Sequence, residues 1–456
     1  MLIEYFSIKK LFGYQDFKIN FKNKDTIFVG ENGMGKTTIL SILYHTLSLN
    51  FYELLDYDFE LIELKYKGVS TFSLNYKDIE LFSRSTRDPN RRLPEGFIKK
   101  VEETIDYNNL DIDDMDKFDK HADLIRIELY KDNIRVSQNM LREAMRYVYQ
   151  NNAGNLKEFI AITKKFLNEY KILYFPTYRR IEEDIYNINN DEGAFYEDTE
   201  SQHYYDPSIN RKRKTKKIGE LIQFGMKDVQ KTLDELLDTI KKTSIESFNK
   251  MTGELLYQYV ENDLEGSINI DDLTEDEILI SLSRVGTEIK TDLQDKIVDM
   301  FKSNSLEKNI YLTNFIINLV AKNHSLEPID NKIQQFVDIC NSYLYGKQFI
   351  YDPSAVTLEI KTTNQDRIIP LSKLSSGEKQ IISTFSKIYL KNDDHLLILF
   401  DEPELSLSIA WQKKFIYDIT QANNCRFSIS VTHSAHIFNK LMDNATELNK
   451  YLRVVD

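Results

Sequence analysis

A glycine-rich turn between an apolar stretch and a helical pattern constrains this chain most. Thr26–Val29 is a compact apolar stretch, and Gly30–Thr37 has the sequence GENGMGKT, which matches the phosphate-loop pattern GxxxxGK[ST]. From Thr37 to Leu49 the apolar residues recur at helical spacing. Glycines let the backbone N–H groups face phosphate oxygens, and the following helix offers its positive end. A chance match in a plain turn is the alternative, but the strand before and the helix after the turn favour a phosphate site.

The residue types in this loop suit a nucleotide and its magnesium ion. Lys36 supplies a positive charge to the β- and γ-phosphates, and the Thr37 hydroxyl can ligate Mg²⁺. We therefore expect ATP and Mg²⁺ to bind at this turn. The predicted nucleotide contacts are Gly30, Asn32, Gly33, Gly35, Lys36, Thr37 and Thr38.

A second apolar strand delivers two carboxylates near the end of the sequence. Leu396–Phe400 is continuously apolar, as buried parallel strands are, and Asp401 and Glu402 follow it directly. Asp401 is predicted to hold Mg²⁺, and Glu402 to polarise the attacking water as general base. Taken alone, the pattern also fits a core strand that ends in an acidic surface turn. The phosphate loop favours the catalytic interpretation.

A serine-rich segment precedes a predicted helix from Gln380 to Tyr389. Leu374–Gln380 has the sequence LSSGEKQ, and the Ser375 hydroxyl with the first N–H groups of the helix can bind a γ-phosphate. A plain helix cap is the alternative. The predicted contacts in this segment are Ser375, Ser376, Gly377 and Glu378.

The serine-rich segment resembles the signature motif of ABC-type ATPases. In that superfamily the signature contacts the nucleotide of a partner subunit, so the resemblance implies a homodimer or higher oligomer around ATP. His433, after a predicted strand over 426–431, resembles the switch histidine that contacts the γ-phosphate there. The resemblance thus adds His433 to Lys36 and Glu402 as a catalytic residue. A structural histidine is the alternative.

The distance between the phosphate loop and the signature resembles the split heads of the Rad50, SMC, RecF and overcoming-lysogenization-defect (OLD) ATPases. Glu404–Ser408 with Trp411 resembles the DEPE-x-x-L segment of the OLD-like and RecF-like members. Ser408 stands where transporters carry an aspartate, so a contact across a dimer at this position does not carry over. The implied fold is α/β, an ABC-type ATPase head with a mixed sheet, split by a helical insertion that forms short arms.

The predicted organisation follows from where helical and strand patterns alternate. Alternation over 61–82 predicts an antiparallel meander, residues 367–371 a further strand, and the stripe from Val229 to Tyr259 one long helix or two joined helices. The expected parts are 1–83 (phosphate-loop half of the head), 84–170 (helical insertion), 171–180 (strand and arginine motif), 181–346 (helical arm) and 347–456 (the other half of the head).

Two segments outside the nucleotide motifs narrow the resemblance. Tyr174–Glu182 and Ile222–Val229 resemble PtuA, the ATPase subunit of Septu and retron-associated anti-phage systems. That family works with a separate HNH endonuclease, PtuB, and no nuclease centre is recognisable in this sequence. The resemblance implies an ATPase that regulates a nuclease partner in defence. The alternatives are a RecF- or Rad50-like clamp that binds DNA directly, and a nucleotide-gated scaffold with negligible turnover.

Composition limits the remaining classes. The chain has 456 residues, 59 Lys and Arg against 72 Asp and Glu, a net charge of −13, and two cysteines, too few for a disulfide framework or a cysteine zinc site. No apolar run is long enough for a membrane helix, so we expect a cytoplasmic protein. Arg179 and Arg180 can contact phosphate or pair with Glu182 or Glu183. A basic run can contact nucleic acid or remain a solvated loop; it comprises Arg211, Lys212, Arg213, Lys214, Lys216 and Lys217.

Overall fold

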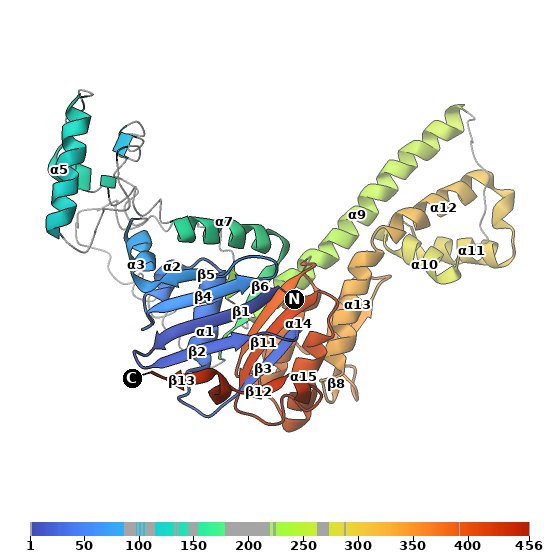
Figure 1. Cartoon of the computed structure of the whole chain (residues 1–456). Helices are drawn as coiled ribbons and strands as arrows, with labels where there is room; N and C mark the ends of the chain where they lie inside the picture. Colours follow the sequence, from blue (N-terminus) through green and yellow to red (C-terminus); the bar gives the residue numbers. More distant parts are fainter. Residues whose placement is uncertain are drawn as a thin grey trace, which may run out of the picture. The chain divides into compact units, whose positions relative to one another are not determined.

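The computed structural model describes most of the chain, in two compact units. The described residues are 2–85, 97, 100, 101, 104, 115–131, 134, 136–142, 144, 145, 154–177, 219–221, 225–261, 273–286, 289–391 and 393–455. The first unit is Met1–Ile222, Asp393–Leu405 and Gln412–Asp456, and the second is Gln223–Asn392 and Ser406–Trp411. The predicted α/β class is confirmed, because the first unit combines β-sheets with α-helices. Its strands come from both ends of the sequence (Figure 1).

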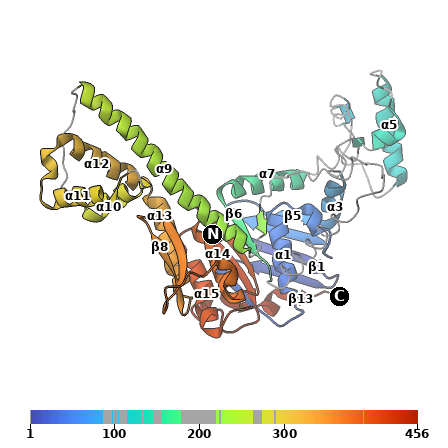
Figure 2. The ribbon, with the colours of Figure 1, turned by 180° about the vertical axis from the view of Figure 1, so that it is seen from behind.

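A parallel sheet forms the centre of the first unit (Figure 2). Its order is β12 (Ala445–Glu447), β3 (Asp25–Val29), β11 (Cys425–Thr432), β10 (Leu396–Asp401), β6 (Lys171–Phe175) and β7 (Gly219–Leu221). Every residue of β10 is buried, as its continuous apolar run predicts. The register aligns the carboxyl ends of four strands, because Thr432 pairs with Val29, Val431 with Asp401, and Phe400 with Phe175.

An antiparallel sheet provides the second layer of this unit. Its order is β13 (Leu452–Val454), β2 (Gln15–Asn20), β1 (Ile3–Leu11), β4 (Leu61–Tyr66) and β5 (Phe72–Asn75). One face is apolar and shares a core with α1 (Lys36–Leu47) and the parallel sheet. The predicted meander was wrong at its end, since Ile79 and Leu81 lie in α3 (Tyr76–Ser85). Ile79 and Phe82, three residues apart, both contribute to that core, as a helical face allows.

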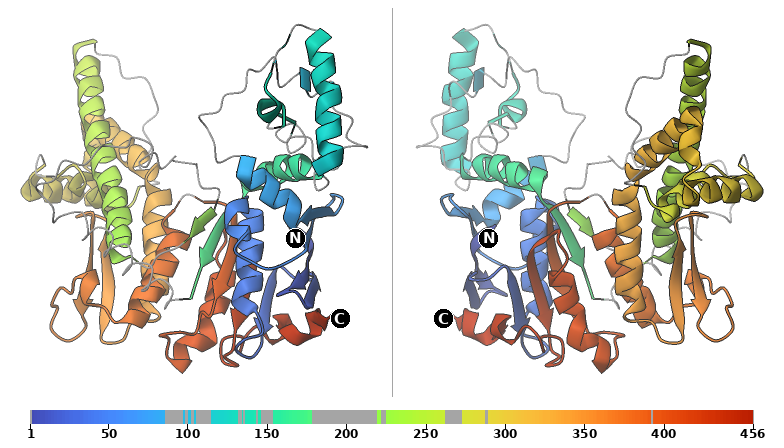
Figure 3. Two further views of the ribbon diagram at one scale, coloured as in Figure 1. Left: turned by 90° about the vertical axis from the view of Figure 1, so that its left-hand side faces the viewer. Right: turned by 90° about the vertical axis from the view of Figure 1, so that its right-hand side faces the viewer.

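The second unit is mainly helical (Figure 3). The predicted long helix is a single one, α9 (Met226–Glu261), with 36 residues. The predicted strand over 367–371 was wrong: Ile368 makes only an isolated bridge to Lys361, and Pro370 has no N–H to extend a ladder. The other elements are α10 (Glu275–Ser283), α11 (Thr291–Lys302), η2 (Leu306–Lys308), α12 (Ile310–His324), α13 (Glu327–Asn341), β8 (Lys347–Asp352), β9 (Thr357–Thr362), η3 (Leu371–Lys373) and α14 (Ser376–Tyr389).

The remaining described elements are four α-helices and two 3₁₀ turns. They are α2 (Phe51–Leu54), α5 (Met115–Lys131), α7 (Gly154–Glu169), α15 (Ile409–Thr420), η4 (Met442–Asn444) and η5 (Leu448–Tyr451). The second unit holds β8, β9 and α14 together with α9 to α13. The predicted assignment of 347–456 to the head stays a prediction. Within the described residues, no helix combines the length and the apolar character needed to cross a bilayer.

Candidate nucleotide site

The phosphate loop connects β3 to α1 in the first unit. Gly35 is the N-cap of α1 with a φ of 77°, and a Cβ atom there would lie 3.0 Å from the Phe12 ring. Both the positive φ and the nearby ring favour glycine at this position. No described side chain caps this helix, and its first turn carries no acidic residue. Its first N–H groups and its positive end therefore face the loop without a competing carboxylate, as a phosphate site needs.

Lys36 is the first residue of α1, and its side chain is buried against the loop. Its Nζ donates to the carbonyl oxygens of Gly30 at 2.8 Å and Glu31 at 3.0 Å, and lies 3.4 Å from Glu402 Oε1. The side chain is only 5% exposed. A buried ammonium group held inside the loop supplies a fixed positive charge for a polyphosphate.

Asp401 ends β10 and receives two hydroxyl groups. Thr37 Oγ1 donates to Asp401 Oδ1 at 3.0 Å, and Thr177 Oγ1 donates to Asp401 Oδ2 at 2.5 Å. Thr37 comes from α1, and Thr177 lies two residues after β6. A carboxylate and a hydroxyl are the hard oxygen donors that Mg²⁺ prefers, so Thr37 and Asp401 fit the predicted ion.

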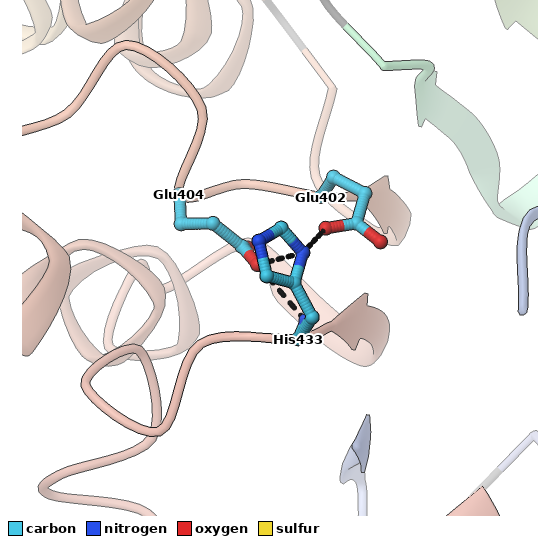
Figure 4. A group of neighbouring side chains, drawn as sticks. All are labelled: Glu402, Glu404 and His433. Atoms are coloured by element: carbon cyan, nitrogen blue, oxygen red, sulfur yellow. Dashed lines mark hydrogen bonds and ion pairs between the residues drawn. The ribbon is translucent and has the colours of Figure 1, made fainter. Parts of the chain in front are cut away.

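Glu402, Glu404 and His433 form a cluster next to Asp401, at the ends of β10 and β11 (Figure 4). His433 Nδ1 hydrogen-bonds Glu402 Oε2 and lies 3.1 Å from Glu404 Oε1. Burial, followed by the charge of Glu404, raises the pKa of Glu402, while the hydrogen bond with His433 and the charge of Lys36 oppose that rise. Each of the three clustered residues offers one ligand atom, and these atoms lie within 4.8 Å of one another, so the cluster can also hold a cation.

A cavity of about 550 Å³ opens beside the phosphate loop. This volume suits part of a nucleotide. Its lining joins the loop to the histidine and to the segment after β12: Val29, Gly30, Glu31, Asn32, Met34, His433, Glu447 and Asn449.

The sequence matches one protein family over nearly its whole length. The AAA ATPase domain family covers residues 1–438. The chain belongs to this family. A search of curated proteins found no match for the chain.

Three solved structures of SMC heads align with this AAA ATPase at low identity. The Smc head with an extended coiled coil bound to the C-terminal domain of ScpA, from Pyrococcus furiosus, is 14% identical with a TM-score of 0.34, over 99% of this chain and 95% of that one. The Smc head with a coiled coil and joint from Pyrococcus yayanosii is 13% identical, with a TM-score of 0.28 and coverages of 100% and 96%. The SmcHead bound to the C-winged helix domain of ScpA is 11% identical, with a TM-score of 0.32 and coverages of 99% and 96%.

The predicted signature of this AAA ATPase lies in the second unit, at the start of α14. The Ser375 N–H donates to Glu378 Oε2 at 2.9 Å and the Glu378 N–H donates to Ser375 Oγ at 3.4 Å, a reciprocal capping box. Lys347 Nζ lies 3.0 Å from Glu378 Oε1. A Cβ at Gly377 would collide with the Ser406 carbonyl oxygen. The serine hydroxyl caps the helix in this structure, and its contact with a phosphate stays a prediction.

The structure brings together five predicted residues, from three segments far apart in the sequence. They are Lys36, Thr37, Asp401, Glu402 and His433. The predicted signature contacts belong to the other unit. Several predictions lie outside the described residues: Arg179, Arg180 and the basic run Arg211, Lys212, Arg213, Lys214, Lys216 and Lys217.

Sequence reasoning missed three contributors to the site. Thr177 binds Asp401, Glu404 contacts His433, and Asn449 lines the cavity. Thr177 could have been found, because it follows an apolar strand shortly after its end, as His433 does, and the carboxyl ends of parallel strands share one edge. No local pattern marks Asn449.

Proposed function

We propose that this AAA ATPase binds ATP with Mg²⁺ and hydrolyses it at the carboxyl edge of the parallel sheet. The observation that carries the proposal is the convergence of Lys36, Thr37, Asp401, Glu402 and His433 around the phosphate loop, next to a cavity of about 550 Å³. These residues supply the parts that phosphoryl transfer to water requires: a phosphate cradle, oxygen ligands, a base and a polar contact.

Each residue has a distinct role in the proposed reaction. The loop N–H groups and Lys36 bind the β- and γ-phosphates, while Thr37 and Asp401 hold the cation. Bound Mg²⁺ neutralises charge on the phosphates. Glu402 orients the attacking water and accepts its proton, and the burial that raises its pKa makes it a better base. His433, which is hydrogen-bonded to Glu402, provides the polar contact to the γ-phosphate.

The direct test is nucleotide binding and steady-state turnover by the purified chain. We expect wild-type protein to bind a fluorescent ATP analogue and to release phosphate. Lys36→Ala should lose both, by at least about 100-fold in turnover, because the phosphate charge is no longer matched. Lys65→Ala is the matched control, since this lysine is paired with Glu4 on the antiparallel sheet. Binding that is unchanged in Lys36→Ala would refute the proposal.

We extend the proposal to oligomer and partner: a homodimer or higher oligomer closes around ATP and regulates a separate HNH nuclease in anti-phage defence. The serine-rich segment before α14 and the PtuA-like segments Tyr174–Glu182 and Ile222–Val229 support it. Light scattering of Glu402→Gln with ATP and Mg²⁺ should show a larger mass than without ATP. Co-expression with an HNH protein from a neighbouring gene should reduce phage plating, and Lys36→Ala should abolish the reduction. An equal reduction of phage plating by wild type and by Lys36→Ala would contradict the defence role.

A nucleotide-gated scaffold remains the closest variant of this proposal. It shares every ATP-binding residue but turns ATP over negligibly. Phosphate release under conditions that saturate ATP binding separates the two: a turnover no faster than in Glu402→Gln would favour the scaffold.

Direct nucleic-acid binding is the second candidate function, and one surface favours it. A cavity of about 580 Å³ lies on the polar face of the antiparallel sheet, where Ser7 pairs with Lys18 and Asp16 with Arg453. Its lining contains four cations, Lys9, Lys18, Lys450 and Arg453, and two acids, Asp16 and Glu63. An excess of cations in a chain of net charge −13 is the kind of patch that contacts phosphates.

Salt-dependent anisotropy with labelled DNA tests this second candidate. Wild type should bind more weakly as salt rises, and the double variant Lys18→Glu with Arg453→Glu should bind at least about 10-fold more weakly at low salt. Lys302→Glu, on α11, is the control. Equal binding by both variants would exclude this surface.

A further inference from the structure

Glu404 lies two residues after the proposed base and is almost completely buried. Only 5% of the surface of Glu404 is exposed to solvent. Three donors from the segment after β11 reach one of its oxygens, Oε1: Thr432 Oγ1 at 2.7 Å, the His433 N–H at 2.9 Å and the Ser434 N–H at 3.1 Å. Three consecutive residues are therefore held by a single carboxylate oxygen.

The same oxygen also approaches the ring of His433. His433 Nδ1 lies 3.1 Å from Glu404 Oε1 and hydrogen-bonds Glu402 (Figure 4). Because two carboxylates face Nδ1, the proton is assigned to this nitrogen. Nε2 is then the ring nitrogen left for a ligand. Glu404 thus fixes both the backbone and the ring orientation of His433.

A second residue ties the two segments together. Gln412 Nε2 donates to the Glu404 carbonyl oxygen at 3.3 Å, and Ser434 Oγ donates to Gln412 Oε1 at 2.8 Å. The segment after β10 and the segment after β11 are thereby joined through α15 as well as through the carboxylate. All of these contacts lie within the first unit.

We propose that Glu404 is a positioning residue for ATP hydrolysis: it holds Thr432–Ser434 so that His433 can meet the γ-phosphate while Glu402 meets the water. The inference rests on the proposed ATPase function and deepens it. A purely structural acceptor could be an amide, whereas a carboxylate here places a second negative charge beside Glu402. The Glu404 carboxylate also contacts the ring of His433, so its negative charge can hold that ring in one orientation.

Kinetics separate positioning from folding. In Glu404→Ala we expect turnover to fall by at least about 10-fold while the ATP concentration for half-saturation changes by less than about 3-fold. Glu404→Gln should keep more turnover than Glu404→Ala, because an amide oxygen can still accept the three donors. Asp25→Asn is the control, a buried carboxylate in the same sheet that accepts from Ser428 Oγ at 2.7 Å. Wild-type turnover in folded Glu404→Ala, or equal losses in both Glu404 variants, would overturn the proposal.

Amide hydrogen exchange tests the geometry without ATP. The amide of His433 should exchange at least about 10-fold faster in Glu404→Ala than in wild type, because it loses its acceptor, while the amides of β10 stay unchanged. Unchanged exchange at this amide would overturn the inference even if the protein hydrolyses ATP. Should Glu404→Ala not fold, Gln412→Ala loosens the same two segments, and wild-type turnover together with wild-type exchange at His433 in that variant would overturn the proposal. If wild-type protein did not bind ATP, the proposed function would be refuted, whereas the exchange result would still stand.

Discussion

The N-termini of α1 and α14 both contain glycine and hydroxyl-bearing residues, but the polar groups at the two ends have different partners. Among the described residues, α1 has no side-chain cap and no acid in its first turn, and the side chain of Lys36 folds over the loop. In α14, Ser375 and Glu378 cap each other, and Lys347 neutralises the carboxylate. The first helix end leaves its N–H groups for an external anion, whereas the second already contains an acid that competes with one.

This difference separates the polar groups of the proposed catalytic site from those that cap a helix. At α1 the charged groups come from segments hundreds of residues apart and meet beside a cavity, so removing one should change chemistry more than stability. At α14 the polar groups come from nearby residues and satisfy each other, so removing one should change stability first. The four predictions below test that contrast, from the largest expected effect to the smallest.

Glu402→Gln should reduce turnover by about 10² to 10⁴, because an amide cannot accept the proton of the attacking water. ATP binding should persist, since the phosphate loop and Lys36 are unchanged. Phosphate release and binding of a fluorescent ATP analogue measure the two properties separately. Glu235→Gln, an exposed carboxylate on α9, is the control and should turn over at the wild-type rate. Equal turnover in both variants would remove Glu402 from the mechanism.

Thr177→Val should raise the Mg²⁺ concentration needed for half-maximal turnover by about 10-fold, because Asp401 loses one of its two hydroxyl partners. The substitution conserves side-chain volume, so the free energy of unfolding should change little. Thr163→Val is the control, since its buried hydroxyl bonds Tyr66 at 3.0 Å, in the core of the same unit. A magnesium requirement equal to that of the control would show that Thr177 only fills space.

Gly377→Ala should destabilise the second unit by about 1–3 kcal/mol, because the new methyl group meets the Ser406 carbonyl oxygen and lies 3.1 Å from Trp411. Gly253→Ala, in the middle of α9, has open space around it and should instead stabilise by about 0.5–1 kcal/mol. Urea unfolding of both variants measures the sign of each change in the free energy of unfolding. A stable Gly377→Ala would mean that the segment from Ser406 to Trp411 yields easily.

The stabilising effect of Glu378 should depend on pH. Burial raises the pKa of Glu378, but hydrogen bonds from Ser375 and Lys347 outweigh burial and lower it overall. A lowered pKa means that its contribution is present above the pKa of the unfolded state, about 4.3, and is lost as pH falls through the folded value. The stability difference between wild type and Glu378→Gln, about 1 kcal/mol at pH 7, should shrink below about pH 4. A difference that does not change with pH would leave Glu378 as a neutral cap.

Much of the site was predictable because each motif carries its own local signal. The strand before Gly30 and the apolar run before Asp401 show that both lie at strand ends, and parallel strands place such ends on one edge. Thr177 and Glu404 were missed, since their functions depend on which strand is adjacent. The order β3, β11, β10, β6 is a long-range property that no segment of the sequence encodes by itself.

Two secondary-structure predictions failed for different reasons. Ile79 and Phe82 are three residues apart, so they can share one face of a helix, and both contribute to the core. Residues 367–371 have strand-like composition, but Pro370 cannot donate to a neighbour. At α3 the packing of one helical face decided between the two local patterns, whereas at 367–371 the missing N–H of proline limited the strand.

The sequence by itself determined the chemistry: a phosphate loop, a carboxylate pair and a histidine, because these residue types and their flanking strands follow from local spacing. The tertiary structure decided which of them act together. It placed Thr177 on Asp401, turned His433 toward both glutamates, and committed Ser375 to its own helix cap. Hydrogen bonds between residues hundreds of positions apart depend on strand order and register, which only the folded chain establishes.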